Sequence, residues 1–279
     1  MVIDSHCHIL PPGFEHRRAE LLARDATFAA LFSRAGAPMA TAESLIDAMD
    51  RAQVSRAVVM GIGWCDRALA EEVNDYIAES VSRHPDRLTG FCSVNPARGD
   101  GAAAEMERCA AAGLRGVGEL HPDTQGFDIT DKPGLAPVMD TALRLGLPVL
   151  VHSSEPVGHQ YPGKGRTTPG KLYRFIENFP ENPVVCAHWG GGLPFYAMMP
   201  EVPKVIENVY FDMAASPFLY RPQVVATVAG LVGADKVLFA TDYPLIEHGR
   251  LMRQVEESGL DSSALEAILG GNAARLLGL

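Results

Sequence analysis

The chain has 279 residues, of which 47% are hydrophobic and 21% charged, a composition typical of a soluble globular protein. Its net charge of −10 and its lack of any Lys/Arg-rich block disfavour a nucleic-acid partner, because nothing attracts a phosphate backbone. No apolar run approaches the roughly 20 residues that span a bilayer, so we expect no membrane partner.

The cysteines indicate a reducing compartment. There are five, an odd number, and they are scattered without the spacing of a zinc-binding pair. Cys7, Cys92 and Cys186 lie in apolar runs, where a free thiol packs as a small hydrophobe. The first apolar run begins at residue 2 and leaves no room for a signal peptide. We therefore expect a cytoplasmic protein.

The first predicted strand, Val2–His6, already carries residues with metal-binding chemistry. His6 and His8 stand two residues apart at its end. Because side chains alternate along a strand, the two imidazoles point to one face and Cys7 points to the other. Two neutral imidazoles that converge on one point commonly bind a metal ion, although an isolated H-x-H pair also fits an ordinary surface hairpin.

Seven further apolar runs follow, separated by helix-like stretches. They are continuously apolar, as parallel strands buried on both faces are. Eight strand–helix units predict an α/β protein with a (β/α)8 TIM barrel in a single domain, residues 1–279. A doubly wound open sheet is the alternative, but none of the runs looks like a polar edge strand. The seven runs are Arg56–Gly61, Leu88–Val94, Leu114–Glu119, Pro148–His152, Pro183–His188, Asn208–Met213 and Lys236–Asp242.

The longest connection after a strand, residues 10–40, carries an apolar stripe of leucines and phenylalanines. We expect it to cover the helices of the barrel, with a lid or a subunit contact as the alternatives. The expected partners are a small-molecule substrate and, if this segment is a subunit contact, a second copy of the chain in a homodimer.

Polar residues stand at the carboxyl ends of the predicted strands, where the active site of such a barrel lies. Any one of them could cap a helix, but six at one end of one barrel predict a metal site. Imidazole and carboxylate ligands without thiolate favour a divalent metal, zinc first, with Mn, Fe, Co or Ni as substitutes. The six residues are His6, His8, Glu119, His152, His188 and Asp242.

These positions resemble those of the amidohydrolase superfamily, most closely its amidohydrolase-related (amidohydrolase 2) branch. The segments GLPVLVHSS, CAHWGGG, VLFATDYP and ILGGNAARLLGL are similar to that branch. The resemblance implies a metal-dependent enzyme, and the branch includes decarboxylases of the aminocarboxymuconate semialdehyde type and lactonases of pyrone dicarboxylate.

The chain departs from this branch after the fourth predicted strand. Many members carry a lysine there in KLHP, whereas this chain has GELHP with Glu119. A glutamate at this position is similar to the TatD-type hydrolases, in which it bridges two metals. The choice between one ion and two therefore stays open.

The predicted chemistry begins with a metal-bound water that ionises near neutral pH. Asp242 would take its proton, and His188 would help to polarise the scissile carbonyl. We therefore expect hydrolysis of an amide, lactone or ester bond in a small molecule. The alternatives are a lyase (decarboxylase or hydratase) on the same centre, a TatD-like nuclease, which the negative net charge opposes, and a metal-binding barrel without catalysis.

Four further residues are predicted to contact the substrate. His121 and His159 lie just past the fourth and fifth predicted strands, and Lys164 and Arg166 lie on a glycine-rich loop beside His152. Arg166 can hold a carboxylate bidentately, which predicts a carboxylated substrate. The alternative is that both cations are only solvated.

Overall fold

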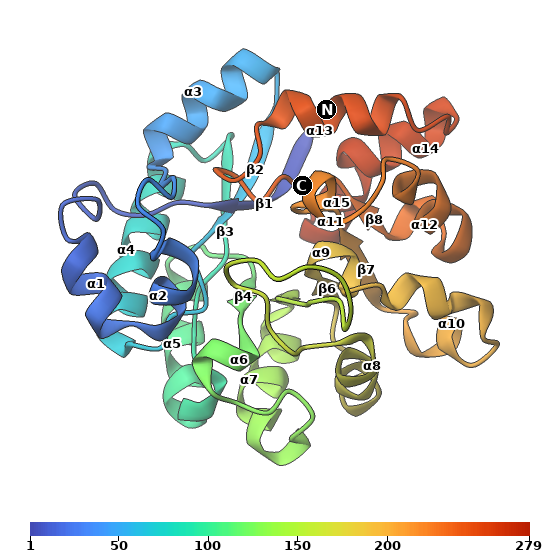
Figure 1. Cartoon of the computed structure of the whole chain (residues 1–279). Coiled ribbons are helices and arrows are strands. Elements are labelled where there is room, and N and C mark those ends of the chain that lie inside the picture. Colours follow the sequence, from blue (N-terminus) through green and yellow to red (C-terminus); the bar gives the residue numbers. More distant parts are fainter.

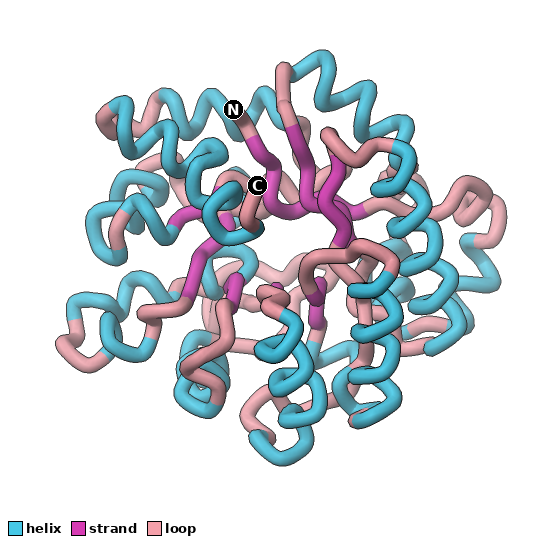
Figure 2. The backbone as a smooth tube through the Cα atoms, turned by 180° about the vertical axis from the view of Figure 1, so that it is seen from behind, coloured by secondary structure: helices cyan, strands magenta, loops and turns pink.

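The computed structural model describes all residues, 1–279, and places short parallel strands at the centre with helices around them (Figures 1 and 2). Hydrogen-bonded ladders connect them into two parallel sheets, in the orders β1-β2-β3 and β4-β5-β6-β7-β8. The strands are β1 (Ile3–His8), β2 (Arg56–Met60), β3 (Leu88–Gly90), β4 (Val117–Leu120), β5 (Val149–Val151), β6 (Val184–Cys186), β7 (Val209–Asp212) and β8 (Val237–Leu238).

Backbone contacts bridge both seams between the two sheets. A parallel bridge joins Cys92, just after β3, to Val117 of β4. On the opposite side a parallel bridge joins Cys7 of β1 to Tyr243, and the N–H of His8 donates to the Tyr243 carbonyl at 2.7 Å. The predicted (β/α)8 barrel is therefore confirmed as the fold.

Helices form the outer layer, and their ends carry the expected local signals. At the start of α3 the Thr41 side chain accepts from the N–H of Ser44 at 3.3 Å, and Gly146 ends α7 with φ 66°. None of the helices combines the length and the apolarity needed to cross a membrane. The helices are α1 (Arg18–Arg24), α2 (Ala26–Phe32), α3 (Ala42–Ala52), α4 (Arg67–Arg83), α5 (Asp100–Ala111), α6 (Pro122–Gln125), α7 (Lys132–Leu145), α8 (Pro169–Asn178), α9 (Ala187–Gly190), α10 (Val202–Val205), α11 (Ser216–Leu219), α12 (Val224–Val232), α13 (His248–Glu256), α14 (Ser262–Glu266) and α15 (Asn272–Leu277).

Two apolar clusters hold the barrel together. The larger one lies between the strands and the surrounding helices. The smaller one lies among the strands, includes Ile3, Phe91 and Leu238, and packs against Ala273 and Leu277 of α15. Of β1 this smaller cluster takes only the first residue, Ile3, so the carboxyl end of that strand remains available for polar side chains.

Several strands are shorter than the sequence predicts. β8 ends at Leu238, whereas the predicted run continues to Asp242, and β5 ends at Val151, one residue before His152. Single backbone hydrogen bonds to the neighbouring strands continue beyond these ends, since the N–H of His152 donates to the Leu120 carbonyl at 2.8 Å and the N–H of Ser5 donates to the Phe239 carbonyl at 2.9 Å. The polar residues therefore lie within the strand ends or on the short turns just beyond them.

The segment 10–40 reaches the mouth of the barrel. It contains α1 and α2, and Phe28 of α2 stacks on Trp64 with ring centroids 5.9 Å apart. Residues 31–38 at its far end contribute to the wall of the cavity described below. The segment thus packs on Trp64, in the loop before α4, and also borders the cavity, while its role as a cover, a lid or a subunit contact stays a prediction.

Candidate metal centre

The six side chains predicted from strand ends meet at the mouth of the barrel. They come from β1, β4, the residue after β5, the short helix α9 and the turn after β8. His6 is fully buried, and Glu119, His188 and His152 are 3%, 5% and 6% exposed. Such burial of imidazoles and carboxylates together requires that they neutralise one another or bind a cation.

His6, His8, Asp242 and Glu119 surround one point. The Nε2 atoms of His6 and His8 are 3.1 Å apart, and His8 Nε2 is 3.1 Å from Asp242 Oδ1. Glu119 Oε2 lies 3.8 Å from His6 Nε2 and 3.7 Å from His8 Nε2. The ligand atoms of a tetrahedral ion with bonds near 2.1 Å are about 3.4 Å apart. His6, His8 and Glu119 could therefore hold one divalent ion, and Asp242 borders this group through its contact with His8.

The other oxygen of Glu119 belongs to a second group. Glu119 Oε1 is 2.9 Å from His152 Nδ1 and 3.5 Å from His188 Nε2. These two nitrogens are 3.2 Å apart. One carboxylate thus turns an oxygen toward each of two separate donor groups, which is the arrangement that a bridging ligand of two ions needs.

The charges in the mouth depend strongly on one another. Burial alone would lower the pKa of His6, but Asp212, Glu119 and Asp242 raise it to about 10. Burial would also lower the pKa of His188, but Glu119 and Asp242 raise it to about 9. Burial would raise the pKa of Glu119, but His152, His188 and His6 hold it well below its usual range. The metal-free chain therefore holds protons at positions that a divalent cation would take.

Asp212, at the end of β7, was not among the predicted site residues. Its Oδ2 accepts from His6 Nδ1 at 2.9 Å, and its Oδ1 accepts the N–H groups of His188 and Ala214 at 2.9 and 3.1 Å. It is fully buried. With its proton on Nδ1, His6 presents the Nε2 lone pair to the mouth. The available signal was an acidic residue at the end of the apolar run NVYFDM.

Left-handed backbone turns two of the site residues toward the mouth. His188 has φ 56° and Asp242 has φ 63°. Such conformations cost a non-glycine residue about 1–3 kcal/mol, so the surroundings must hold them. Asp212 binds the N–H of His188, and the N–H of Asp242 donates to the His6 carbonyl at 3.0 Å. These bonds offset the cost.

A cavity of about 410 Å³ opens above the site and is lined by all of the six residues except His6. Most of its outer wall is apolar, and the loop after β5 contributes His159 and Tyr161 to it. Arg34, from the segment 10–40, is the one Lys or Arg side chain in the lining, and it is exposed. The apolar lining residues are Leu31, Phe32, Ala37, Pro38, Ile62, Pro162, Ala215, Phe218, Leu219, Pro244 and Leu245.

Of the four predicted substrate contacts, the structure brings only His159 into the cavity lining. The Lys164 ammonium donates to the carbonyls of Val157 and His159 at 2.8 and 2.9 Å, within its own loop. The Arg166 side chain is 89% exposed and lies 3.5 Å from Asp123. Neither cation points into the cavity, because both interact with neighbouring groups of the loop and of α6.

His121 lies behind His152. The two rings stack with centroids 4.1 Å apart and an angle of 13° between them. His121 Nε2 is 3.1 Å from the Gly163 carbonyl, and burial together with His152 lowers the pKa of His121 to about 4. A neutral His121 therefore supports the plane of His152 and holds the loop after β5.

Comparison with known proteins agrees with this site. The amidohydrolase family model matches residues 3–279. The chain is 27% identical to 2-amino-3-carboxymuconate-6-semialdehyde decarboxylase of Dictyostelium discoideum over 243 residues, 76% of this chain and 67% of that one. It is 25% identical to gamma-resorcylate decarboxylase of a Polaromonas species over 256 residues, 75% of this chain and 76% of that one.

A solved structure shows the same fold. It is 5-carboxyvanillate decarboxylase of Novosphingobium aromaticivorans, complexed with manganese and 4-hydroxy-3-methoxy-5-nitrobenzoic acid. The TM-score is 0.83 at 17% identity, and the match covers 100% of this chain and 96% of that chain. Together with the family match along nearly the whole sequence, this confirms the resemblance found in the sequence: the chain belongs to the amidohydrolase family.

Proposed function

We propose that this chain is a metal-dependent decarboxylase of a small aromatic or conjugated carboxylic acid. The observation that carries the proposal is that both sequence relatives described above, each matched over about three quarters of the chain, are decarboxylases. They favour the lyase alternative over the hydrolysis that we expected first. The TatD-like nuclease and the barrel without catalysis gain no support from these relatives.

The donor set supports a divalent metal as the cofactor. His6, His8, Asp242 and Glu119 would hold one ion, and Glu119, His152 and His188 would hold a second. A bound divalent ion supplies positive charge that stabilises substrate oxygens as charge moves through the substrate. The ligand types favour zinc, whereas the structure of 5-carboxyvanillate decarboxylase contains manganese. Elemental analysis of the purified protein distinguishes the two metals.

Asp242 is the residue best placed to move a proton. Burial would raise the pKa of Asp242, but His8, His6 and His188 lower it, so the resting residue is a carboxylate that can accept a proton from water or from a substrate hydroxyl. The protonated Asp242 then gives this proton to the carbon that bears the substrate carboxylate. A π electron pair of the conjugated substrate forms the new C–H bond. The C–C bond breaks, its electrons restore the conjugation, and CO2 leaves.

The lining of the cavity supports the proposal of a substrate with an apolar body and an anionic end. Its volume suits a small molecule, and its apolar wall faces the polar centre. Arg34 stands in this wall and would bind a second anionic group of the substrate bidentately. Arg34 would thus fill the role that the sequence suggested for Arg166.

The test is a panel of aromatic and conjugated acids, with esters and lactones beside them, incubated in D2O. We expect CO2 and product in equal amounts, with one deuterium on the vacated carbon. Products of ester or lactone cleavage without a new C–D bond would contradict the proposal. For an accepted acid, Arg34→Met should raise KM at least about tenfold, and Arg166→Met should leave it unchanged. The reverse pattern would favour Arg166.

A further inference from the structure

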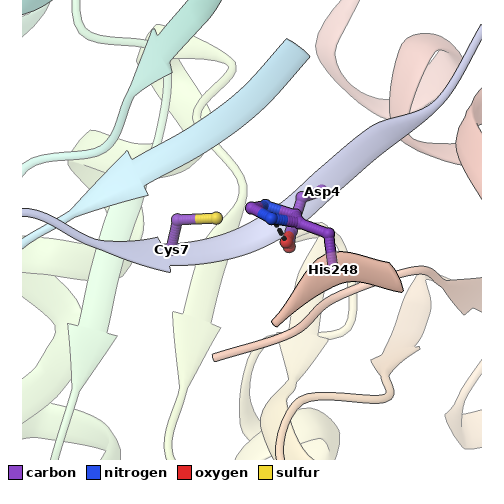
Figure 3. A group of neighbouring side chains, drawn as sticks. All are labelled: Asp4, Cys7 and His248. Atoms are coloured by element: carbon purple, nitrogen blue, oxygen red, sulfur yellow. Dashed lines mark ion pairs between the residues drawn. The ribbon is translucent and has the colours of Figure 1, made fainter. Parts of the chain in front are cut away.

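A second group of buried polar side chains lies beside β1, separate from the six residues of the proposed metal centre (Figure 3). Asp4 and Cys7 belong to β1, and His248 is the first residue of α13. All three are fully buried. His248 Nε2 lies 3.2 Å from Asp4 Oδ2 as an ion-pair contact, with neither ring nitrogen of His248 in a hydrogen bond, and the Cys7 sulfur points toward the same place. Nothing in the proposed reaction uses these residues.

Asp4 connects the two chain segments that carry metal-centre residues. Its Oδ1 accepts the N–H of His6 at 3.1 Å and the N–H of Thr241 at 3.0 Å, and its Oδ2 accepts the Thr241 hydroxyl. His6 is a proposed ligand, and Thr241 directly precedes Asp242. One carboxylate therefore fixes the backbone beside both residues.

This connection adds to the backbone bonds between β1 and the segment that follows β8. The N–H of Ser5 donates to the Phe239 carbonyl at 2.9 Å, and the N–H of Asp242 donates to the His6 carbonyl at 3.0 Å. The carboxylate of Asp4 adds a side-chain connection to the same segment at Thr241. The His248 ring packs on Tyr243, with centroids 5.2 Å apart and an angle of 23°. It thus contacts both Asp4 and the residue after Asp242.

We propose that His248 is a positioning residue of the metal centre, acting through Asp4 to fix His6 and Asp242. This inference rests on the proposed metal centre. The group is a less suitable metal site, because the Asp4 oxygens already accept two backbone N–H groups and one hydroxyl. An ion there would have to displace the Thr241 hydroxyl from Oδ2.

The experiment compares metal affinity in three variants. His248→Phe keeps a ring against Tyr243 and removes the polar contact with Asp4, and His248→Gln restores a polar side chain beside Asp4. Tyr243→Phe is the matched control, since it removes only the hydroxyl that donates to the Ser44 carbonyl at 3.3 Å. Competition with a chromophoric chelator gives the dissociation constant. We expect about tenfold weaker binding in His248→Phe, recovery in His248→Gln, and no change in Tyr243→Phe.

The outcomes separate this inference from the proposed centre. A wild-type protein that binds no metal overturns both, whereas equal affinities of wild type and His248→Phe overturn this inference alone. If His248→Phe fails to fold, Thr241→Val removes the hydroxyl on the same Asp4 oxygen and should weaken binding several-fold; unchanged binding overturns the inference. A thiolate-to-cobalt absorption band that is lost in Cys7→Ser would also overturn it, by showing that the group binds metal itself.

Discussion

Replacing Asp212 with Asn should disable His6 as a ligand although the side chain keeps its shape. Asp212 Oδ1 accepts two backbone N–H groups, so the amide oxygen of the variant must stay on that side. Its NH2 group then takes the place of Asp212 Oδ2, which lies 2.9 Å from His6 Nδ1, and so faces that nitrogen. Because two donors cannot share one bond, His6 must move its proton to Nε2, the atom that faces the mouth.

A protonated Nε2 has no lone pair to give a metal. Loss of such a partner typically weakens metal binding 10- to 100-fold, about 1.4–2.7 kcal/mol. The assay is chelator competition on metal-depleted protein, with thermal unfolding to confirm that the variant folds. Asp25→Asn is the control, since Asp25 is also buried and accepts backbone N–H groups, but at the start of α2. Unchanged affinity in a folded Asp212→Asn protein would refute the reasoning, and an equal loss in the control would attribute it to general destabilisation.

Three further predictions concern the same centre. Glu119→Gln should reduce the metal content from two ions per chain to one, and equal content near one in both proteins would leave Glu119 as a hydrogen-bonding group. Asp242→Asn should keep most of the metal but lose activity by about 10²–10⁴-fold, because an amide cannot accept the proton; wild-type rates would exclude that role. Metal binding at about pH 7.5 should release protons and strengthen as pH rises, since the pKa values of metal-free His6 and His188, about 10 and 9, keep both charged. Calorimetry in buffers of different ionisation enthalpy measures the release, and identical heats would contradict it.

The same two pKa values determine how the metal-free fold responds to pH. Both lie above the ordinary histidine value of 6.5. The stabilisation that His6 and His188 contribute is therefore complete below about pH 6.5, and it is lost as pH rises through about 9 and 10. Bound metal would take over this neutralising role, so the holoprotein should not lose this stability as the pH rises.

The fold and the six converging residues could be predicted because both follow from strand topology. Parallel strands in a closed barrel bring their carboxyl ends together, so a polar residue that ends an apolar run must face the same mouth. Glu119 and His152 illustrate this, since they are far apart in sequence and 2.9 Å apart in the structure. Asp212 follows the same rule, because it too ends a strand. It lies inside the predicted run Asn208–Met213 and is therefore not included among the predicted site residues.

The substrate contacts could not be predicted in the same way. Lys164 and Arg166 lie on a loop whose position follows from the sequence, but the direction of their side chains depends on carbonyls and on Asp123. Arg34 comes from the long connection after β1, and only its packing across the mouth brings it into the cavity wall. Loop side chains thus depend on tertiary contacts that strand patterns do not encode.

The class of reaction is not determined by the donor set, because hydrolysis and decarboxylation need the same parts. Each requires a cation that holds substrate oxygens and a carboxylate that moves a proton. The difference is where the proposed proton donor, Asp242, would deliver that proton, to a leaving heteroatom or to carbon. A proton on a heteroatom exchanges with solvent, whereas a proton on carbon does not. The apolar wall around Phe218 and Leu245 favours carbon, since it stabilises an uncharged conjugated ring and the departing CO2 better than a charged leaving group.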